Sequence, residues 1–389
     1  MANLLFKNAR LVFPDRIEPR GDLRVADGRI AAIGPALTPE PGDMVQELGG
    51  RLLAPGFIDI HLHGALGRDA MEATSEAFEA ICRHHATGGT TALALATVAA
   101  PTPAIVRVLD AAAAYRREPH DGAQLLGIHV EGPYFSPEKR GAHRPECLRN
   151  PTPADYAPLL ERADALTQMT LAPELPGALA LIEALRARGV RVSGGHSNAW
   201  DEEACAAFAH GMEGVTHTFN CMSSSRRRGP YRVAGLLEFA LSEPGILCEL
   251  IADGRHVSPT LMRMLYHAKG PEGIVLVTDA TAGTGLPEKT PFQLGEIGCV
   301  VRDGVGLTAG GSALAGSTSP MIHLVRTLVQ SAGVPLAEAL RMASLNAARA
   351  LSLPHKGALA PGADADLVLL SDTLEVVATF VQGRRVYRA

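Results

Sequence analysis

The feature that most constrains the fold is an alternation of short, very apolar segments with amphipathic helical ones through the middle of the chain. Segments of helical character, such as 75–85, 178–188 and 201–210, separate the apolar runs. Most of these runs are nearly continuous in Val, Ile and Leu, which is typical of parallel strands buried on both faces. Eight such runs occupy 57–62, 90–98, 125–130, 169–172, 190–193, 214–218, 247–252 and 274–278. The pattern predicts an α/β fold, either a (β/α)8 barrel or an open doubly wound sheet.

The two ends of the chain resemble each other and differ from the middle. Residues 3–13, 22–33 and 46–53 are strand-like runs separated by turn signals, and residues 363–389 repeat that texture. Neither end holds enough strands for a stable sheet of its own. We therefore expect both termini to form one small β-sandwich beside the barrel. In the expected organisation, residues 1–53 and 357–389 together make the sandwich, and residues 54–356 make the barrel.

Polar residues gather at one end of the apolar runs. Six of the eight runs end at, or lead directly into, a His, Asp or Glu. In barrel enzymes the chemistry lies at the carboxyl ends of the strands, so this recurrence favours the barrel over the open sheet. The residues concerned stand in His61-Leu62-His63, His129-Val130-Glu131, Gly195-His196, Thr216-His217, Asp253-Gly254-Arg255-His256 and Thr278-Asp279.

The types of these residues predict a catalytic metal. His61 and His63 are two positions apart, so on a strand both side chains point to the same face. Glu131, His196 and His217 add two imidazoles and a carboxylate, a set that holds Zn²⁺ or Fe²⁺ and leaves one position open for water. We therefore expect a divalent metal, zinc or ferrous iron, at the strand ends.

Each of these residues also has a purely structural interpretation. A single strand-end histidine is more often a hydrogen-bonded structural residue than a ligand, and Glu131 or Asp279 could cap the helix that follows. Their joint occurrence at matching strand ends favours the metal site. His84 and His85 lie on an amphipathic helix, and we interpret them as surface or packing residues. His129 sits one layer below Glu131, and we interpret it as a hydrogen-bonded polar residue of the core.

Composition narrows the class of protein further. The chain has 389 residues, of which 47% are hydrophobic, and a net charge of −5, which gives no sign of a nucleic-acid surface. Six cysteines are scattered without CxxC spacing, as expected of free thiols in a reducing compartment. No secretory signal and no apolar run long enough to span a membrane is evident. We therefore expect a cytoplasmic enzyme without a nucleic-acid or membrane partner.

The ordered motifs resemble a known family. The segment Pro55-Gly56-Phe57-Ile58-Asp59, leading into His61-Leu62-His63, resembles the amidohydrolase superfamily. Further segments resemble the N-acetylglucosamine-6-phosphate deacetylase family within it, in that family's order and nearly from end to end. They are Gly127–Pro133 in the form GIHVEGP, KRGAH at 139–143, GHSNA at 195–199, THTFNCM at 216–222, DGRHV at 253–257 and VTDAT at 277–281.

The resemblance implies roles for the strand-end residues. Glu131, His196 and His217 would hold the main metal, and Asp279 would be the general base that takes a proton from the attacking water and returns it to the leaving amine. By the same resemblance, the segment of Ala142 and His143 would contact the substrate. His143 and His256 would touch the sugar or its carbonyl and help to stabilise the oxyanion. With both His61 and His63 present, a second and weaker metal bridged by Glu131 is also feasible.

The phosphate site is predicted from the same resemblance. It places Asn220 and the backbone amide of Cys221 at the phosphate, together with an arginine eight residues after the asparagine, here Arg228. The segment 226–232 departs from the family pattern, so Arg227 or Arg232 are alternatives, and a solvated basic loop is the plain interpretation. The arginine could also act across the interface of a homodimer. The segment Leu314-Ala315-Gly316 matches a substrate-contacting loop of the family, with a tight turn as the plain alternative.

The resulting hypothesis is hydrolysis of the N-acetyl group of N-acetyl-D-glucosamine 6-phosphate, a small amino-sugar phosphate. The N-acetylgalactosamine analogue differs at one hydroxyl, which no motif distinguishes. A cyclic-amide hydrolase of the dihydroorotase type usually carries a lysine after the fourth strand, whereas this chain reads Ala172-Pro173-Glu174 there. A non-catalytic scaffold would not need the complete set of polar strand ends.

Overall fold

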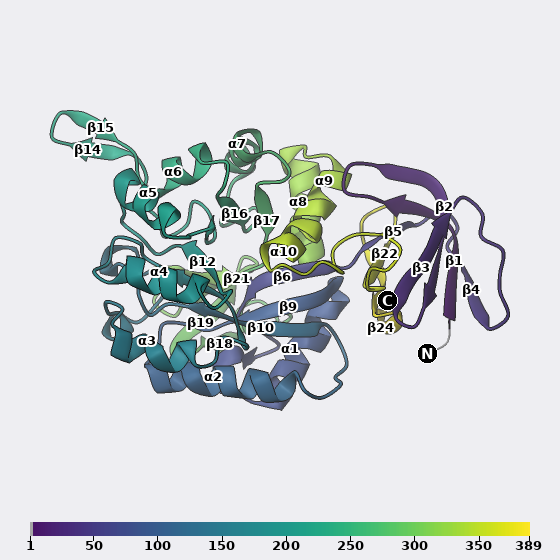
Figure 1. Cartoon of the computed structure of the whole chain (residues 1–389), viewed down its shortest axis with the longest axis horizontal. Coiled ribbons are helices and arrows are strands. Elements are labelled where there is room, and N and C mark those ends of the chain that lie inside the picture. Colours follow the sequence, from purple (N-terminus) through teal and green to yellow (C-terminus); the bar gives the residue numbers. More distant parts are fainter. Residues whose placement is uncertain (1–2) are drawn as a thin grey trace.

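The computed structural model describes residues 3–389, and its centre is the predicted barrel (Figure 1). Eight parallel strands follow one another around the barrel in the order of the sequence, which excludes the strand order of a doubly wound sheet. The strands are β6 (Phe57–Leu62), β9 (Thr90–Ala96), β10 (Gln124–Glu131), β11 (Leu166–Leu171), β12 (Arg191–Gly194), β13 (Gly214–Val215), β16 (Leu247–Leu250) and β17 (Ile274–Leu276). All eight predicted runs are therefore strands of this barrel.

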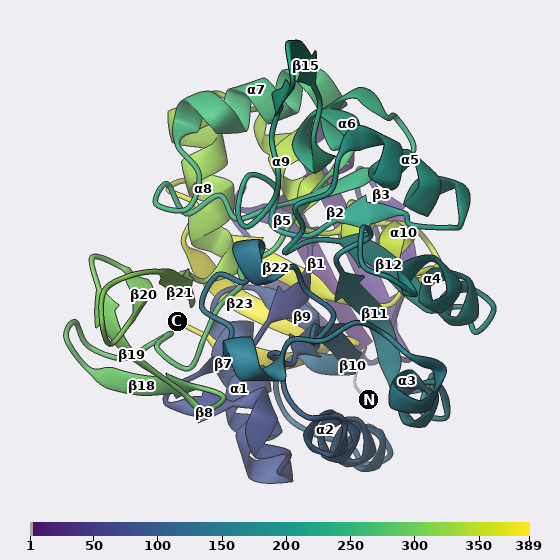
Figure 2. The ribbon, with the colours of Figure 1, turned by 90° about the vertical axis from the view of Figure 1, so that its left-hand side faces the viewer.

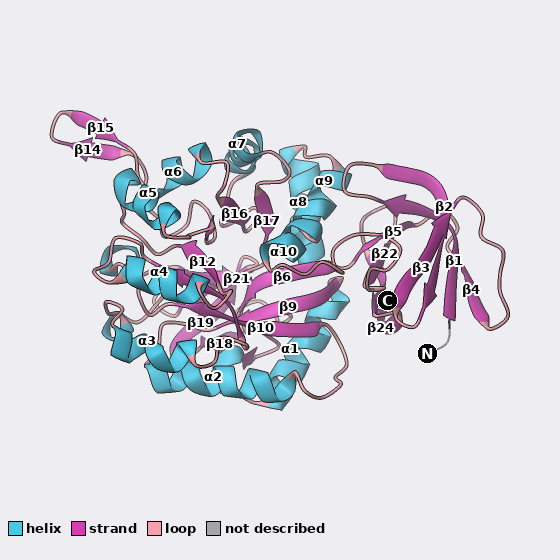
Figure 3. Cartoon of the chain, viewed as in Figure 1, coloured by secondary structure: helices cyan, strands magenta, loops and turns pink. Residues whose placement is uncertain are grey.

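Helices form the outer layer around these strands (Figures 2 and 3). Each helix turns an apolar stripe inward, and the strands are buried from both sides, so a continuous core lies between the two layers. The helices are α1 (Ser75–Thr87), α2 (Thr102–Tyr115), α3 (Pro153–Leu160), α4 (Ala178–Arg186), α5 (Asp201–Ala209), α6 (Leu236–Ser242), α7 (Pro259–Lys269), α8 (Met321–Ala332), α9 (Leu336–Met342) and α10 (Leu345–Ala350). Short 3₁₀ turns stand at Ala70–Glu72, Pro137–Lys139 and Pro145–Cys147. In the described part of the chain, no helix has the length and apolar character that crossing a membrane requires.

Closure of the barrel depends on polar groups as well as on backbone pairing. The Asp279 amide donates to the carbonyl of His61 at 2.8 Å, which joins the end of the eighth strand to the first. Below it, the buried carboxylate of Asp59 accepts from the amide of Thr278 at 3.2 Å and from its hydroxyl at 2.5 Å. The first and last strands are thus held together directly beneath two predicted site residues.

Both ends of the chain contribute strands to one unit, as predicted, but the strands belong to a single eight-stranded sheet where the sequence predicted a β-sandwich. It runs in the order β24-β23-β22-β5-β1-β2-β3, with β4 paired to β1. Its strands are β1 (Asn3–Val12), β2 (Ile17–Ala26), β3 (Arg29–Gly34), β4 (Asp43–Glu47), β5 (Leu52–Pro55), β22 (Leu367–Leu370), β23 (Val376–Val381) and β24 (Arg384–Arg388). The rings of Phe6 and Phe380, on strands that are not neighbours, lie 5.1 Å apart, so the sheet folds over a core of its own.

Strand β22 shows how this sheet is attached to the barrel. Leu367 and Leu369 belong to the core of the terminal sheet, whereas Val368 and Leu370 belong to the core of the barrel. Alternate side chains of a strand point to opposite faces, so one short strand serves two cores. The Thr379 hydroxyl adds a 2.7 Å hydrogen bond to the carbonyl of Ala86 at the end of α1.

Three excursions from the barrel were not foreseen in the sequence. A four-stranded antiparallel sheet is inserted between β17 and α8, and a hairpin projects from the body between β13 and α6 (Figure 1). The sheet consists of β18 (Pro291–Leu294), β19 (Ile297–Arg302), β20 (Val305–Thr308) and β21 (Leu314–Ser317). The hairpin consists of β14 (Arg226–Arg228) and β15 (Tyr231–Val233), and a further small pair is formed by β7 (Gly64–Ala65) and β8 (Arg68–Asp69).

Candidate metal centre and active site

A pocket of about 240 Å³ opens at the carboxyl ends of the barrel strands. It gathers residues that are far apart in the sequence and that the motifs singled out. Among its lining residues are His63, Glu131, Ala142, His143, His196, His217, Asn220, Cys221, His256, Asp279, Leu314, Ala315 and Gly316. Of the predicted site residues, His61 lies fully buried beneath the pocket and Arg228 lies outside it.

The carboxylate of Glu131 is the centre of this arrangement. Its Oε1 lies 3.2 Å from Nε2 of His196 and 3.3 Å from Nε2 of His217. Those two ring nitrogens lie 3.0 Å from each other. Three potential ligand atoms therefore converge on one point, on the side of Glu131 that faces β12 and β13.

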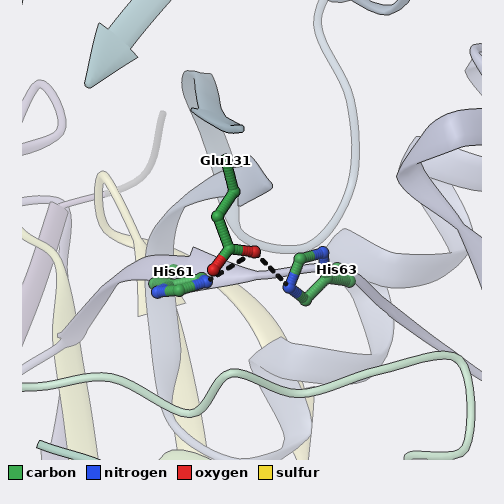
Figure 4. A group of neighbouring side chains, drawn as sticks. All are labelled: His61, His63 and Glu131. Atoms are coloured by element: carbon green, nitrogen blue, oxygen red, sulfur yellow. Dashed lines mark ion pairs between the residues drawn. The ribbon is translucent and has the colours of Figure 1, made fainter. Parts of the chain in front are cut away.

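The other oxygen of Glu131 faces the first strand. Its Oε2 lies 3.2 Å from Nε2 of His63 and 3.5 Å from Nε2 of His61, as the dashed lines in Figure 4 show. Oδ1 of Asp279 lies 3.1 Å and 3.6 Å from the same two nitrogens. Glu131 thus stands between two groups of imidazoles and offers one oxygen to each.

Hydrogen bonds on the far side of two rings orient the nitrogens that face Glu131. Nδ1 of His196 lies 2.9 Å from the carbonyl oxygen of Lys139, which can only accept, so Nδ1 carries the proton and donates. Nδ1 of His61 lies 3.0 Å from the carboxylate of Glu249 and donates in the same way. A carboxylate or carbonyl behind a histidine is the usual support of a metal ligand, because it leaves Nε2 directed at the ion.

The residues fit a divalent metal ion. Nε2 of His61 is a buried nitrogen without a hydrogen-bond partner among the described residues, and burying such a group without a partner is unfavourable. His61, His63 and Glu131 place ligand atoms within 4.8 Å of one another. Imidazole nitrogen with carboxylate oxygen is a donor set that zinc and ferrous iron share.

Opposite charges in the pocket shift one another's pKa values. Burial alone would lower the pKa of His63, but Asp279 and Glu131 outweigh it and raise the pKa to about 9. For Asp279 burial opposes ionisation, but the hydrogen bond from His63 and the charges of His61 and His63 lower the pKa to about 2. The carboxylate of Asp279 is therefore ionised throughout the neutral range and able to accept a proton.

Two further histidines reach the pocket in different states. Nδ1 of His143 accepts from the amide of Ala99 at 3.2 Å, and burial lowers the pKa of His143 to about 3, so its ring is neutral. Nδ1 of His256 lies 2.6 Å from Oδ2 of Asp253, and this carboxylate raises the pKa of His256 against the effect of burial. His143 is thus a neutral hydrogen-bond donor, and His256 is a donor whose ring is held by the carboxylate of Asp253.

The backbone at the strand ends is bent in an unusual way. His196, His217, Cys221 and Asp279 have φ values of 48°, 31°, 48° and 47°, a left-handed region that residues other than glycine seldom adopt. Such conformations persist where the surrounding structure enforces them, and they cluster at functional sites. Here they turn the chain at the mouth of the barrel.

A glycine is required beside Asp279. Gly316 on β21 has a φ of 70°, and a Cβ at this position would lie 2.5 Å from the carbonyl oxygen of Asp279. Any larger residue would push β21 away from Asp279. The predicted Leu314-Ala315-Gly316 segment is therefore a strand of the inserted sheet that closes one side of the pocket, rather than a tight turn.

The predicted phosphate residues are separated in the described chain. Asn220 and Cys221 line the pocket, whereas Arg228 lies on the exposed β14–β15 hairpin. Its guanidinium pairs with Glu202 at 2.6 Å and lies over the ring of Trp200 at 4.1 Å. Within one copy of the chain, therefore, Arg228 does not reach the pocket.

Two buried carboxylates beneath the pocket were missed in the sequence. Glu249, fully buried on β16, supports His61 and accepts from Nε2 of Gln168 at 2.8 Å. Burial raises the pKa of Asp59 to about 7, against the hydrogen bonds it receives from Thr278. Both stand within apolar runs, where an acidic residue in a segment otherwise expected to be buried is a signal, and Asp59 also belongs to the motif at 55–59.

Comparison with known proteins agrees with the sequence motifs. The amidohydrolase family matches residues 52–386. A rat N-acetylglucosamine-6-phosphate deacetylase is 38% identical, with 99% of this chain and 96% of the relative aligned. An N-acetylgalactosamine-6-phosphate deacetylase of Escherichia coli O157:H7 is also 38% identical, over 93% of each chain.

Solved structures show the same relationship. A mutant N-acetyl-D-glucosamine-6-phosphate deacetylase from Mycobacterium smegmatis, solved in complex with N-acetyl-D-glucosamine-6-phosphate, superposes with a TM-score of 0.91 at 33% identity. That comparison covers 99% of this chain and 100% of the other. The deacetylase of Pasteurella multocida gives a TM-score of 0.92 at 31% identity, with 100% of both chains covered. The chain therefore belongs to the amidohydrolase family.

Proposed function

We propose that this protein is a metal-dependent deacetylase that hydrolyses N-acetyl-D-glucosamine 6-phosphate to D-glucosamine 6-phosphate and acetate. The observation that carries the proposal is the convergence of His61, His63, His196 and His217 on the two oxygens of Glu131, with Asp279 beside them. Relatives that share this family and nearly the whole length of the chain bear that activity in their names.

Glu131, His196 and His217 would hold the main metal, since their ligand atoms lie 3.0–3.3 Å from one another. His61 and His63, with the second oxygen of Glu131, would hold a weaker second ion. Zinc and ferrous iron both suit this donor set. When bound, the metal would lower the pKa of an attacking water and polarise the carbonyl of the amide.

Asp279 would act as the general base. Its carboxylate is ionised, lines the pocket and is held 3.1 Å from Nε2 of His63. A carboxylate in this position takes the proton of the attacking water and then gives it to the amide nitrogen as the C–N bond breaks. Asp279 therefore serves as base in the first step and as acid in the second.

His143 and His256 would act on the reacting oxygen and the sugar. Nδ1 of His143 is occupied by the Ala99 amide, so the proton of its neutral ring is on Nε2, which points toward Glu131. His256 receives its orientation from Asp253. Donors that are fixed before the substrate arrives stabilise the negative charge that develops on the amide oxygen without a further reorganisation cost.

The phosphate would be bound by Asn220 and the amide of Cys221, together with Arg228 of a second copy of the chain. An arginine at the tip of a projecting hairpin is well placed to cross an interface, and its planar fork matches phosphate oxygens. On this proposal the active form is a homodimer. Substitution Arg228→Ala should raise the KM for the phosphorylated sugar much more than for the unphosphorylated sugar, and an equal rise for both would remove Arg228 from the phosphate site.

Mixing two impaired variants, assayed at a low concentration of the phosphorylated sugar, tests whether one copy supplies its arginine to the other. A hybrid dimer of Arg228→Ala and Asp279→Asn chains has one pocket with an intact base and an arginine supplied by its neighbour. Mixing should therefore restore activity if the arginine acts across the interface. If verified hybrid dimers are no more active than the separate variants, Arg228 either acts within its own chain or has no role at the phosphate.

The substrate itself is tested by acetate release from a panel of N-acetylhexosamines, each with and without a 6-phosphate. The galactosamine compound is the second candidate, because a relative with that activity is as similar as the rat enzyme. If the metal-loaded enzyme releases acetate from neither phosphorylated sugar, the proposal is refuted.

We also propose that the protein acts in the cytoplasm. All six cysteines are free, in keeping with a reducing compartment.

A further inference from the structure

A second and larger cavity lies at the opposite end of the barrel. Its volume is about 1060 Å³, and it shares no lining residue with the catalytic pocket. The amino ends of four barrel strands line it, through Gln124, Leu166, Arg191 and Leu247. The segment after α10 and the turn between β23 and β24 of the terminal sheet also contribute. Cavities between a barrel and a companion domain are common places for small ligands to bind.

Arg191 places a buried positive charge in the lining of this cavity. Its side chain is 3% exposed, and its Nη1 and Nη2 make no hydrogen bond within the described chain. No carboxylate of the described residues pairs with it directly: the charges of Glu249 and Glu213 act on it from farther away, and Glu213 already pairs with Arg186. A buried cation without a partner is costly, so a protein that keeps one gains from an anion brought to it.

The sequence also makes room for this guanidinium. On the neighbouring strand stands Gly214, where a Cβ would lie 2.1 Å from Nη2 of Arg191. A larger residue would displace the guanidinium group. Gly214 thus leaves room for the guanidinium of Arg191, whose Nη1 and Nη2 have no hydrogen-bond partner in the described chain. The fold therefore holds a positive charge at a fixed position.

The other basic residues of the cavity separate into paired and unpaired ones. Six Lys or Arg residues line it against three Asp or Glu residues, so the lining has an excess of positive charge. Arg116 and Arg349, both exposed, form no ion pair with a described residue, and the Arg116 guanidinium donates to the carbonyl of Asp164 at 2.8 Å, so Arg349 is the one left without a partner among the described residues. The paired ones are Arg186 with Glu213, Arg384 with Asp121 and Lys356 with Asp364 and Asp366.

We propose that this cavity is a second binding site, which takes a small organic anion through the guanidinium groups of Arg191 and Arg349. Guanidinium binds phosphate and carboxylate oxygens through paired hydrogen bonds, so both classes of anion share the chemistry. Leu126, Leu351 and Leu353 line the same cavity and would contact the carbon skeleton of the ligand. The site shares no lining residue with the catalytic pocket at the other end of the barrel.

Isothermal titration calorimetry with inorganic phosphate, and separately with acetate, tests the proposal and distinguishes the two classes of anion. The titrations use the full-length, metal-loaded protein as wild type, Arg191→Gln, Arg349→Gln and Arg186→Gln. Arg186 is the matched control, because it lines the cavity but already pairs with Glu213. Loss of one charge-assisted hydrogen bond should weaken binding roughly tenfold or more in Arg191→Gln and Arg349→Gln, and much less in the control.

Phosphate is also expected to bind in the catalytic pocket, so the sites must be separated. Arg349→Gln should keep the wild-type KM for the phosphorylated sugar while losing one class of phosphate sites. Amide hydrogen exchange should show protection of residues 116–126 and 345–356 on addition of the anion, in wild type only. If Arg191→Gln does not fold, Arg349→Gln decides alone.

Several results would overturn the proposal. These are the absence of phosphate and acetate binding outside the catalytic pocket, equal isotherms for wild type and Arg349→Gln, or protection confined to the pocket at the strand carboxyl ends. None of them bears on the deacetylase activity, since calorimetry and hydrogen exchange at this cavity need no turnover.

Discussion

Replacing Asp279 with asparagine separates the proposed general-base role from the structural contacts of this residue. Asparagine has the same size as aspartate, and its amide oxygen can take the place of Oδ1, which lies 3.1 Å from Nε2 of His63 and 3.6 Å from Nε2 of His61. The side chain is only 12% exposed, so it has little freedom to reorient. The variant should therefore fold normally, with the pocket intact.

The expected loss lies in turnover. An amide does not accept a proton at neutral pH, whereas the carboxylate of Asp279 is ionised there because the neighbouring histidines hold its pKa at about 2 against burial. Removal of a positioned general base slows a reaction by about 10²–10⁴-fold, which corresponds to roughly 3–5 kcal/mol of activation free energy. Glu131, His196 and His217 are untouched, so metal content should stay at the wild-type level.

The assay combines acetate release with metal analysis of the same protein samples. We expect kcat to fall by the factor above, while KM for the phosphorylated sugar and the metal content change little. Turnover within about tenfold of wild type would refute the assignment of Asp279 as base, since so small a loss is below the range of general-base catalysis. Loss of metal in the variant would instead make Asp279 a ligand.

Three further predictions concern the metal. The double variant His196→Ala, His217→Ala should lose the main metal, and full occupancy by elemental analysis would place the site elsewhere. Glu249→Gln should weaken metal binding on the His61 side by about 10–100-fold, because it removes the carboxylate behind Nδ1, and unchanged affinity in a chelator competition would contradict this. In the metal-free protein His63 has a pKa raised to about 9, against burial, by Asp279 and Glu131, so it carries a proton at neutral pH. Metal binding should therefore release protons, and the affinity for the metal should increase as pH rises toward about 9. Calorimetry in buffers of different ionisation enthalpy measures the number of protons released, and a value of zero would contradict the prediction.

The barrel and most of the candidate site were predictable because their signals are local. Each strand is an apolar run, and each ligand candidate stands within two residues of the end of its strand, as His196 does, while Asp279 follows its strand by three residues. A barrel brings the carboxyl ends of all eight strands together, so residues at the ends of separate strands lie close to one another in space. The resemblance to the family added the roles that position alone leaves open.

What was missed depends on distant partners. Glu249 lies within an apolar strand, and its partner His61 stands 188 residues away, so no local sequence pattern predicts the hydrogen bond between them. The inserted sheet of β18 to β21 has short strands joined by turns, which look like an irregular loop in the sequence. For the same reason, the exposed position of Arg228 on a hairpin could not be distinguished from a loop folded back over the pocket.

The pairing of both termini in one sheet has a consequence for synthesis on the ribosome. Strand β5 pairs with β22, in the register Leu53 with Leu369, so the sheet that begins with the first residues is completed only by the last ones. Until then the apolar side chains of Phe6 and Leu53 have no cover from β22 and β23. The emerging chain must therefore carry an unfinished strand edge while the whole barrel is being made, and such edges invite aggregation. Loss of the final strands should consequently reduce the yield of folded protein without altering any residue of the catalytic pocket.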